Sequence, residues 1–550
     1  MINTEYKDTL AINGQTFKAM IAAALTWLKT NQQIVNALNV FPVPDGDTGT
    51  NMVLTMQAAY NEIQNLEENN IGKIAHAIAQ GALMGARGNS GVILSQIWRG
   101  FARGLDSLEE MDASILTRAL VEAKITAYKG VVRPVEGTIL TVIKDIATTS
   151  EEIKDQDHIL EILEILVQAA DKSVIHTPEL LPILKQAGVV DSGGKGLFFI
   201  FEGFLKFLRG ESLDTSSAII VKPLELMEGN ELEDIEPGQD FEVIVDFRPS
   251  KSFNLDVFYA DLEKMGTSIQ VGEGDGIYRM HIHVPTENRY MPIDYAMTCG
   301  TITKVYVENL LDQMENKGKE SDQPLSLTEV EPGQIAVVAI SPGKGLSKIF
   351  ASLGAAAVVE GGQTMNPSTE EILHAFEDLP TDKIIILPNN KNIILAATSA
   401  KKASVKQVEV LASNTVPQGL AAMLRLDPYS ELDEVYEEMQ AALSEVDTGE
   451  ITVATRSVTI NEVDVKEGQA IALLNSQLVC ASETIEGACL SLLEKVDLSE
   501  RERFTFFYGA NISNEEVNHV IDHVREKFPN IEVELHQGGQ PHYQFIISIE

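Results

Sequence analysis

Apolar residues recur at helical spacing in one segment after another from Gly14 to about Gly210. Spacings of three and four residues gather apolar side chains on one face of a helix, and such faces must pack against each other. The pattern therefore predicts an all-helical domain for residues 1–210. The clearest helical segments are 71–86, 90–105, 113–128 and 158–175.

The breaks between these helices are not ordinary surface turns. They carry clusters of Gly, Ser, Thr, Asn and Asp, in the segments 44–51, 85–91 and 190–196. Loops of this kind open helices, and the first turn of a helix has backbone N–H groups that are available to anions. We therefore expect these loops to carry the chemistry of the domain.

The pattern changes after residue 210. Residues 211–239 are acidic and contain proline, which predicts a linker. Residues 240–311 then read as strand, helix, two strands, helix and strand, an order that predicts a small ferredoxin-like α+β domain. The elements expected there are strands 241–247, 268–271, 277–284 and 302–307 and helices 254–265 and 291–297.

A second polar linker, 312–334, leads into the C-terminal part of the chain. From residue 335 to about 443, short β-branched runs alternate with helical stretches, which is typical of a parallel α/β sheet. The residues from 451 on mix strands and helices. We expect one α/β domain over 335–550, with lobes at 335–446 and 450–550.

Charge and composition exclude several classes of function. The net charge is −39 and no basic run is present, so we expect no binding to a nucleic-acid backbone. No apolar run reaches the roughly 18 residues needed to span a bilayer, and the N-terminus lacks a signal pattern. Cys299, Cys480 and Cys489 are too scattered for a disulfide framework, which fits a reducing compartment. These features predict a cytoplasmic protein without stable membrane insertion.

Two aspartates flank a glycine in the segment 39–51, which reads Asn-Val-Phe-Pro-Val-Pro-Asp-Gly-Asp-Thr-Gly-Thr-Asn. The tight backbone can direct the carboxylates of Asp45 and Asp47 toward one Mg²⁺, which prefers oxygen ligands and takes few carboxylates from the protein. The helix that follows offers N–H donors and hydroxyls to a polyphosphate. An isolated Asp-Gly-Asp is more often an Asx-type turn with a helix cap, but the long context favours the metal site.

This run resembles the ATP-binding, DhaL-type domain of the dihydroxyacetone kinases, and more closely the A-subunit family of the bacterial fatty acid kinases. The resemblance extends over essentially the whole chain. It implies that residues 1–210 form a barrel of antiparallel helices that binds ATP and Mg²⁺ at one end. It also implies a homodimer formed through the middle domain.

Three further motifs occur in the order of that family. The segment 85–91 resembles its second phosphate loop, 133–138 its third nucleotide contact, and 188–194 its nucleotide-closing loop. By resemblance, Asp45 and Asp47 are the catalytic, metal-holding residues. The resemblance assigns the phosphates to Thr48, Gly49, Thr50, Asn51, Asn89, Ser90 and Gly91. It assigns further nucleotide contacts to Thr138, Asp191 and Gly193.

One position differs from the dihydroxyacetone kinases. Those domains supply a third aspartate just upstream of the pair, where this chain has Asn39. An amide can ligate a metal ion but does not neutralise its charge. Asn39 therefore remains a candidate ligand, and the number of metal ions, one or two, stays open.

His281 and His283 lie in a predicted strand, so their imidazoles face the same side, roughly 7 Å apart along the chain. The pair is either catalytic, metal-binding or structural, and a metal site would need a third ligand. The family has a His-x-His implicated in activity in its middle domain. Its usual cysteine in the first strand is absent here, where Val243 or Ile244 stands, so we expect a role in transfer or structure rather than zinc binding.

The turns at the strand ends of the C-terminal domain are rich in glycine. Parallel sheets bind ligands at such ends. Lys344 lies in one of these turns, but its spacing is not that of a Walker loop, so structural turns are expected. By resemblance, this DegV-like domain, with its segments 362–367 and 387–390, docks a fatty-acid-binding carrier protein.

The leading hypothesis is phosphoryl transfer from ATP to the carboxylate of a carrier-bound fatty acid. Such a carboxylate has a pKa of roughly 4 to 5, so it is ionised at neutral pH and needs no general base. The alternatives are a glycerone (dihydroxyacetone) kinase or phosphoryl-relay protein, and a nucleotide-sensing scaffold without turnover. The chain lacks a recognisable ketone-binding half, which favours the first hypothesis over the second.

Overall fold

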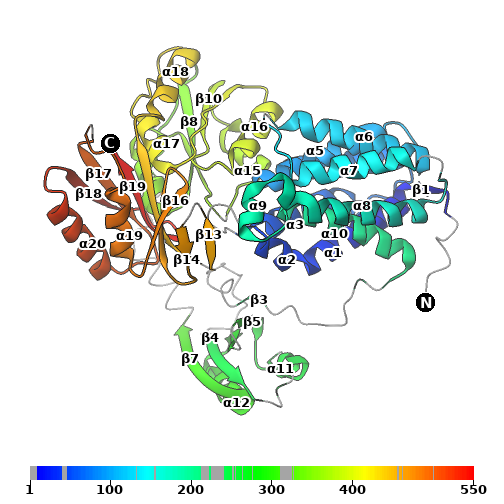
Figure 1. Cartoon of the computed structure of the whole chain (residues 1–550), viewed down its shortest axis with the longest axis horizontal. Coiled ribbons are helices and arrows are strands. Elements are labelled where there is room, and N and C mark those ends of the chain that lie inside the picture. Colours follow the sequence, from blue (N-terminus) through cyan, green and yellow to red (C-terminus); the bar gives the residue numbers. More distant parts are fainter. Residues whose placement is uncertain are drawn as a thin grey trace. The chain divides into compact units, whose positions relative to one another are not determined.

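The computed structural model describes residues 9–39, 46–131, 133–153, 156–211, 213, 222–223, 241–250, 253, 255–262, 264–274, 277–309, 325, 327–363, 365–454, 457–460, 463–499 and 501–550. The chain divides into two compact units (Figure 1). One combines residues 1–213 with residues 325–550, and the other contains residues 214–324. Most of both predicted linkers lies outside the described residues.

The N-terminal part of the first unit is helical, as predicted. A short antiparallel pair, β1 (Ala11–Asn13) and β2 (Glu110–Asp112), is its only sheet among the described residues. Its helices are α1 (Gly14–Thr30), α2 (Gln32–Ala37), α3 (Thr48–Ile63), α4 (Ile71–Met84), α5 (Gly88–Gly104), α6 (Ala113–Gly130), α7 (Ile139–Glu152), α8 (Ile159–Leu180), α9 (Pro182–Ala187) and α10 (Ser192–Arg209).

The long helices contact each other around a closed ring. Its order is α1, α3, α4, α5, α6, α7, α8, α10 and back to α1, and Figure 1 shows α5 to α8 running side by side. Because successive helices are joined by short connections, neighbours run antiparallel. Every second helix therefore begins at the same end of the ring, which places the starts of α3, α5, α7 and α10 together.

Apolar side chains from all of these helices fill the ring. Phe17 of α1 stacks on Phe101 of α5 at 5.7 Å between ring centroids, and Trp98 lies edge-on to Phe101 at 5.8 Å. All three rings are buried in one core. Burying each such side chain contributes about 1.5–3 kcal/mol, so the core fixes the helix ends against each other.

The second unit is a small α+β structure with the predicted order of elements. Its strands and helices are β3 (Lys222–Pro223), β4 (Phe241–Pro249), α11 (Leu255–Leu262), β5 (Thr267–Gly274), β6 (Ile277–Val284), the 3₁₀ turn η3 (Thr286–Asn288), α12 (Met291–Cys299) and β7 (Gly300–Asn309). The sheet order is β3-β5-β6-β4-β7, and β6 is antiparallel to both β4 and β5. Strand β3 is not expected from the sequence, because it lies in the first linker, and among the described residues it pairs with β5 alone. The ferredoxin-like classification stays a prediction.

The C-terminal part of the first unit begins with a parallel sheet of order β11-β10-β8-β9. Strand β8 is buried along its whole length, as expected for a central parallel strand with helices on both faces. The elements are β8 (Ile335–Ser341), α14 (Lys344–Ser352), β9 (Ala357–Glu360), α15 (Thr369–Glu377), β10 (Lys383–Leu387), α16 (Ile394–Ala403), β11 (Gln407–Val410), α17 (Val416–Met423) and α18 (Leu432–Ala442).

The last hundred residues form a second, mainly antiparallel sheet of order β16-β15-β12-β19-β17-β18, in which only β17 and β18 are parallel among the described strands. A hairpin of β13 and β14 is separate from it. The elements are β12 (Asp447–Val453), β13 (Val458–Ile460), β14 (Val463–Val465), β15 (Ala470–Leu474), β16 (Gln477–Ser482), α19 (Ile485–Leu493), β17 (Arg503–Tyr508), α20 (Asn514–Lys527), β18 (Glu532–Gln537) and β19 (Tyr543–Ile549).

Within the part of the chain that the structure describes, no helix has both the length and the apolar character needed to cross a membrane.

Candidate functional site

The predicted phosphate and metal motif opens helix α3. Gly46 has a φ of +58°, a left-handed conformation that favours glycine, and it turns the chain into Asp47, the residue that precedes the helix. Thr50 is held by the preceding helix, because its hydroxyl oxygen accepts hydrogen bonds from Gln32 at 2.9 Å and Asn36 at 3.2 Å. The first turn of α3 is thereby fixed against α2.

The starts of α3, α5, α7 and α10 lie close together, as the ring requires. A Cβ added to Gly88, at the start of α5, would lie 2.6 Å from Nδ2 of Asn51. The hydroxyl of Ser192, which opens α10, lies 3.3 Å from that of Thr48. Gly193 in turn lies against Ile139, the first residue of α7. The predicted phosphate residues of α3 and α5 therefore meet at one end of the ring.

The four helix starts differ in how they are capped. The side chains of Thr138 and Asp191 accept hydrogen bonds from the first turns of α7 and α10. The residues before α3 and α5, Asp47 and Arg87, make no such bond. In the first turn of α3 the N–H of Thr50 donates to Oδ1 of Asn36 at 3.2 Å. The remaining N–H groups of these two first turns have no capping side chain from Asp47 or Arg87 and are available to an anion.

Asp47 is a buried carboxylate, with a relative exposure of 7%. Its Oδ2 accepts a hydrogen bond from Asn366 at 2.5 Å, and its Oδ1 lies 3.5 Å from Nδ2 of Asn39. Burial raises the pKa of Asp47 to about 6, although hydrogen bonds with Asn51 and Asn366 lower it in part. No cationic side chain of the described residues pairs with this carboxylate, so a bound cation would supply the missing charge.

Other predicted site residues lie before Asp47 in the sequence and at the starts of α5 and α10. Asp45 lies outside the described residues, so its role stays a prediction. Asn89 and Ser90 are in the first turn of α5, and Gly91 follows them. Burial raises the pKa of Asp191 to about 6, although its carboxylate accepts a hydrogen bond from the backbone of Gly194 at 2.6 Å.

Loops of the C-terminal α/β part reach the same end of the ring. The loop after β9 carries Asn366, and Glu371 of α15 pairs with Arg87 at 2.8 Å. The loop after β10 carries Asn392, which accepts a hydrogen bond from Asn89 at 3.1 Å. The sequence interpretation missed these contacts, because it assigned segment 362–367 to carrier docking alone. The Asn-Pro pair after a glycine-rich turn is the only signal that marked Asn366.

His281 and His283 lie on β6 with ring centroids 5.0 Å apart. The register of the sheet places Glu242 of β4 directly opposite His283, and Oε1 of Glu242 lies 3.3 Å from Nε2 of His281. Ligand atoms of these three residues all lie within 4.8 Å of one another. The sequence interpretation looked for a cysteine in the first strand and overlooked this glutamate, which supplies the missing third candidate ligand.

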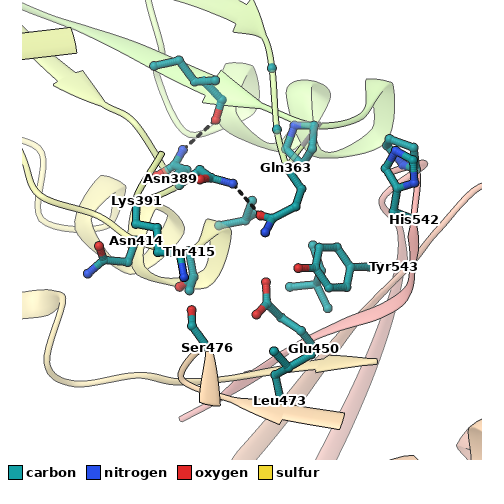
Figure 2. A pocket seen from close by; sticks show the side chains of 18 residues that line it. Gln363, Asn389, Lys391, Asn414, Thr415, Glu450, Leu473, Ser476, His542 and Tyr543 are labelled. Carbon is teal, nitrogen blue, oxygen red and sulfur yellow. Dashed lines mark hydrogen bonds between the residues drawn. The ribbon is translucent and has the colours of Figure 1, made fainter. Parts of the chain in front are cut away.

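A second candidate site is a cavity of about 40 Å³ at the carboxyl ends of the parallel strands (Figure 2). Loops after β9, β10 and β11 line it from one side, and β12, β15 and β19 line it from the other. Figure 2 shows Gln363, Lys391 and Glu450 pointing into the same space. Asn390 donates a hydrogen bond to Gln363 at 2.8 Å and so joins the two loops that also carry Asn366 and Asn392.

Glu450 is the exceptional group of this cavity. Burial raises the pKa of Glu450 to about 7, and the positive charge of Lys391 opposes this shift only in part. Among the described residues no hydrogen bond or ion pair reaches its carboxylate. No sequence signal marks this position, since a single glutamate within a strand is usually exposed on the outer face.

Three family models match the chain in succession. Residues 42–206 match a DAK2 domain. Residues 236–317 match the middle domain of FakA-like proteins, which are the A subunits of fatty acid kinases and their relatives. Residues 336–550 match the C-terminal domain of the same proteins. The chain is also 39% identical to Protein YloV of Bacillus subtilis (strain 168), over 98% of this chain and 99% of that protein. The chain belongs to the FakA-like family of fatty acid kinase proteins. An uncharacterized protein of Staphylococcus aureus (strain USA300) is 37% identical over the same shares of both chains.

Several solved structures are similar to about two fifths of the chain. One is the fatty acid kinase B3 protein of Streptococcus pneumoniae loaded with linoleic acid, with 11% identity, a TM-score of 0.27, and coverage of 40% of this chain and 99% of that one. Another is DegV, a fatty acid binding protein from Bacillus subtilis, with 14% identity, a TM-score of 0.29, and coverage of 39% and 99%.

Proposed function

We propose that this member of the family is the ATP-binding component of a fatty acid kinase and transfers the γ-phosphoryl group of ATP to the carboxylate of a fatty acid held by a separate carrier protein. The observation that carries the proposal is the meeting of four helix starts around the buried carboxylate of Asp47, which no cationic side chain of the described residues pairs with.

The phosphates of ATP fit this end of the ring because of its charge pattern. Apart from the N–H of Thr50, which donates to Asn36, the first turns of α3 and α5 offer backbone N–H groups. The hydroxyls of Thr48, Thr50 and Ser90 lie in the same turns. Each helix start carries a partial positive charge of roughly half an elementary charge, so the starts together attract a polyanion. No basic side chain is needed to hold the phosphates.

The residues present also fit Mg²⁺. Asp47 supplies a carboxylate, Asn39 supplies an amide, and the sequence motif adds Asp45. When bound, the metal ion neutralises charge on the phosphates and holds them in place. Ionising Asp47 in its buried position is unfavourable without a cation, which makes the site selective for a positively charged occupant.

The reaction mainly needs the fatty carboxylate to be aligned with the γ-phosphoryl group of ATP. An oxygen of the ionised fatty carboxylate attacks the γ-phosphorus, a new P–O bond forms, and the bond to the oxygen bridging to the β-phosphorus breaks. ADP leaves and an acyl phosphate remains. The carboxylate has no proton to lose, so a catalytic base is not required.

The acceptor would arrive through the C-terminal part of the chain. The loops after β9 and β10 touch Asp47 and Asn89 directly, so a carrier docked on this part would lie near the phosphates. Membership of a fatty acid kinase family supports a fatty acid carrier as the partner. Homodimerisation through residues 240–311 and a cytoplasmic location are the remaining predictions of this proposal.

One assay tests the proposal. The chain is incubated with ATP, Mg²⁺, fatty acid and a carrier protein, and acyl phosphate is trapped with hydroxylamine. Fatty hydroxamate should form with the wild type and fall by at least roughly 100-fold with Asp47→Ala and with Asp45→Ala. Asp106→Ala is the matched control, because Asp106 is an exposed aspartate of the same domain.

The same assay separates the alternatives. Phosphorylation of dihydroxyacetone without hydroxamate would support a glycerone kinase. Tight ATP binding without consumption, with any carrier or acceptor, would support a nucleotide-sensing scaffold. Either result would overturn the proposed acyl phosphate chemistry.

A further inference from the structure

A glutamate and two histidines meet on the surface of the last lobe, far along the sequence from the nucleotide residues. Glu486 lies in the first turn of α19, and His519 and His523 lie one turn apart on α20. Residues at positions i and i+4 of a helix face the same side, so both imidazoles point toward α19. Helices α19 and α20 contact each other directly.

The ligand atoms converge on one point. Nδ1 of His523 lies 2.9 Å from Oε1 of Glu486, and Nε2 of His519 lies 3.2 Å from Oε2 of the same carboxylate. All the ligand atoms of this trio lie within 4.8 Å of one another. A tetrahedral ion with bonds of about 2.0–2.1 Å needs ligand atoms about 3.3 Å apart, which is close to these distances.

Ordinary hydrogen bonding does not account for the trio. Nδ1 of His523 is buried and has no hydrogen-bond partner among the described residues, even though a carboxylate oxygen is 2.9 Å away. The nitrogen and the oxygen are thus near each other without the direction that an N–H donor requires. Leaving a buried polar atom without a partner is unfavourable, and an ion bound between the two atoms would satisfy both of them.

We propose that Glu486, His519 and His523 form a binding site for a late first-row transition-metal ion, with Zn²⁺ as the occupant. Imidazole nitrogen combined with carboxylate oxygen suits Zn²⁺ and its neighbours, whereas Mg²⁺ and Ca²⁺ take sets made of oxygen alone. Three protein ligands leave a fourth position for water. The proposal does not depend on the function proposed for the nucleotide end.

The ion would join two helices that pack on different parts of the last sheet. Helix α19 contacts β15 and β16, and helix α20 contacts β18. A second cross-helix pair, Glu494 with Lys527, lies further along the same two helices. Metal binding to the folded state alone stabilises that state in proportion to the logarithm of metal concentration, so the lobe should become harder to unfold.

The test uses Co²⁺ as a spectroscopic substitute for Zn²⁺ on the full chain. The histidines of the other trio are first removed by His281→Ala and His283→Ala, and excess Mg²⁺ fills oxygen sites. We expect one equivalent of Co²⁺ with visible absorption of a low-coordinate ion, and its displacement by Zn²⁺. Adding His523→Ala or Glu486→Gln should raise the Kd by at least roughly tenfold.

The matched control is His536→Ala, which removes an exposed histidine that also lies near a glutamate but belongs to no such trio among the described residues. It should leave Co²⁺ binding unchanged. The melting temperature should rise with Zn²⁺ in the His536→Ala chain and not in the His523→Ala chain. Unchanged Co²⁺ affinity in both His523→Ala and His519→Ala, or no binding in the starting chain, would overturn the site.

Discussion

Asp47 is buried, and burial disfavours the ionised form of its carboxylate unless a cation is present. It is buried at the end of the helical ring, and its partners among the described residues are neutral amides. These amides stabilise the ionised carboxylate without neutralising it, so the pKa of Asp47 stays at about 6. In the proposed function, the amide of Asn366 therefore tunes how readily Asp47 accepts a metal ion.

Replacing Asn366 tests this role. Asn366→Ala removes the 2.5 Å hydrogen bond to Asp47, and a hydrogen bond to a charged group is worth about 1.5–3 kcal/mol. We expect the Mg²⁺ concentration that half-saturates ATP binding to rise roughly tenfold, with a larger effect at pH 6 than at pH 8. Titration calorimetry measures it, and Met365→Ala, an exposed neighbour in the same loop, is the control. Equal Mg²⁺ dependence in both variants would contradict the role.

Glu450 gives a second prediction at this scale, on stability. Its folded-state pKa of about 7 lies above the ordinary 4.5, so the folded chain keeps a proton that the unfolded chain has released between these values. Its contribution to stability is therefore full below pH 4.5 and is lost as pH rises through 7.

Glu450→Gln should match the wild type near pH 4 and exceed it at pH 8 by on the order of 3 kcal/mol, at about 1.4 kcal/mol for each pKa unit. Urea unfolding at a series of pH values measures the difference. Glu438→Gln, an exposed glutamate of α18, should show no such divergence. A Glu450→Gln curve parallel to that of the wild type would show that the acid is not buried as described.

At the scale of elements, the site depends on where helices begin. The ring alternates helix direction, so α3, α5, α7 and α10 all start at one end, and close packing there needs residues without side chains. Two requirements favour glycine at position 88. The first is a φ of +55°, and the second is close packing, because a Cβ there would lie 2.6 Å from Nδ2 of Asn51. Gly468, in the last lobe, has a φ of +81° and open space around it and meets only the first.

These two glycines form a matched pair for mutation. Gly88→Ala and Gly468→Ala should each lose about 1 kcal/mol of stability, because alanine is strained at positive φ. Only Gly88→Ala should weaken ATP binding, by roughly tenfold or more, because its methyl group displaces Asn51 from the phosphate end. Fluorescent-nucleotide binding and thermal melting measure both effects. Similar ATP affinity in the two variants would argue against contact between α3 and α5 at the phosphates.

At the scale of the whole molecule, the first compact unit brings together segments that a linear domain map separates. The helical ring and the α/β part share an apolar cluster that includes Ala86, Val92 and Ile340. Arg87 also donates hydrogen bonds to the carbonyl of Asn366 and to Glu371. The end of the ring proposed to bind the nucleotide is therefore built partly from residues beyond 325.

A double-mutant cycle on Arg87 and Glu371 tests this arrangement in solution. The pair is partly exposed, so its coupling should be about 0.5–1 kcal/mol, and the single variants should weaken Mg²⁺-ATP binding several-fold and non-additively. The cycle on Lys73 and Glu68, a pair within the helical ring, should leave ATP binding unchanged. Fully additive effects at Arg87 and Glu371 would mean that the two parts do not touch there.

The local pattern of residues in the sequence determined much of the secondary structure and the positions of the loops that open the helices. Periodicity identified the helical character of residues 1–210, the order of elements in the middle unit and the parallel sheet, although α8 continues to Leu180 beyond the predicted end at 175. The closed ring was expected from the family resemblance alone. The loops that open α3 and α5 were also identified from sequence, because local backbone geometry requires glycine and small polar residues there.

Contacts between distant segments were decided only by the tertiary structure. Asn366 reaches Asp47 across 319 residues, Glu242 meets the histidines through strand register, and Glu486 meets His519 and His523 through helix packing. Glu242 and Glu486 have no distinctive neighbourhood in the sequence, because each obtains its partners from elements that lie far away along the chain. Sequence periodicity fixes which face of an element is buried, and only packing fixes which other face it meets.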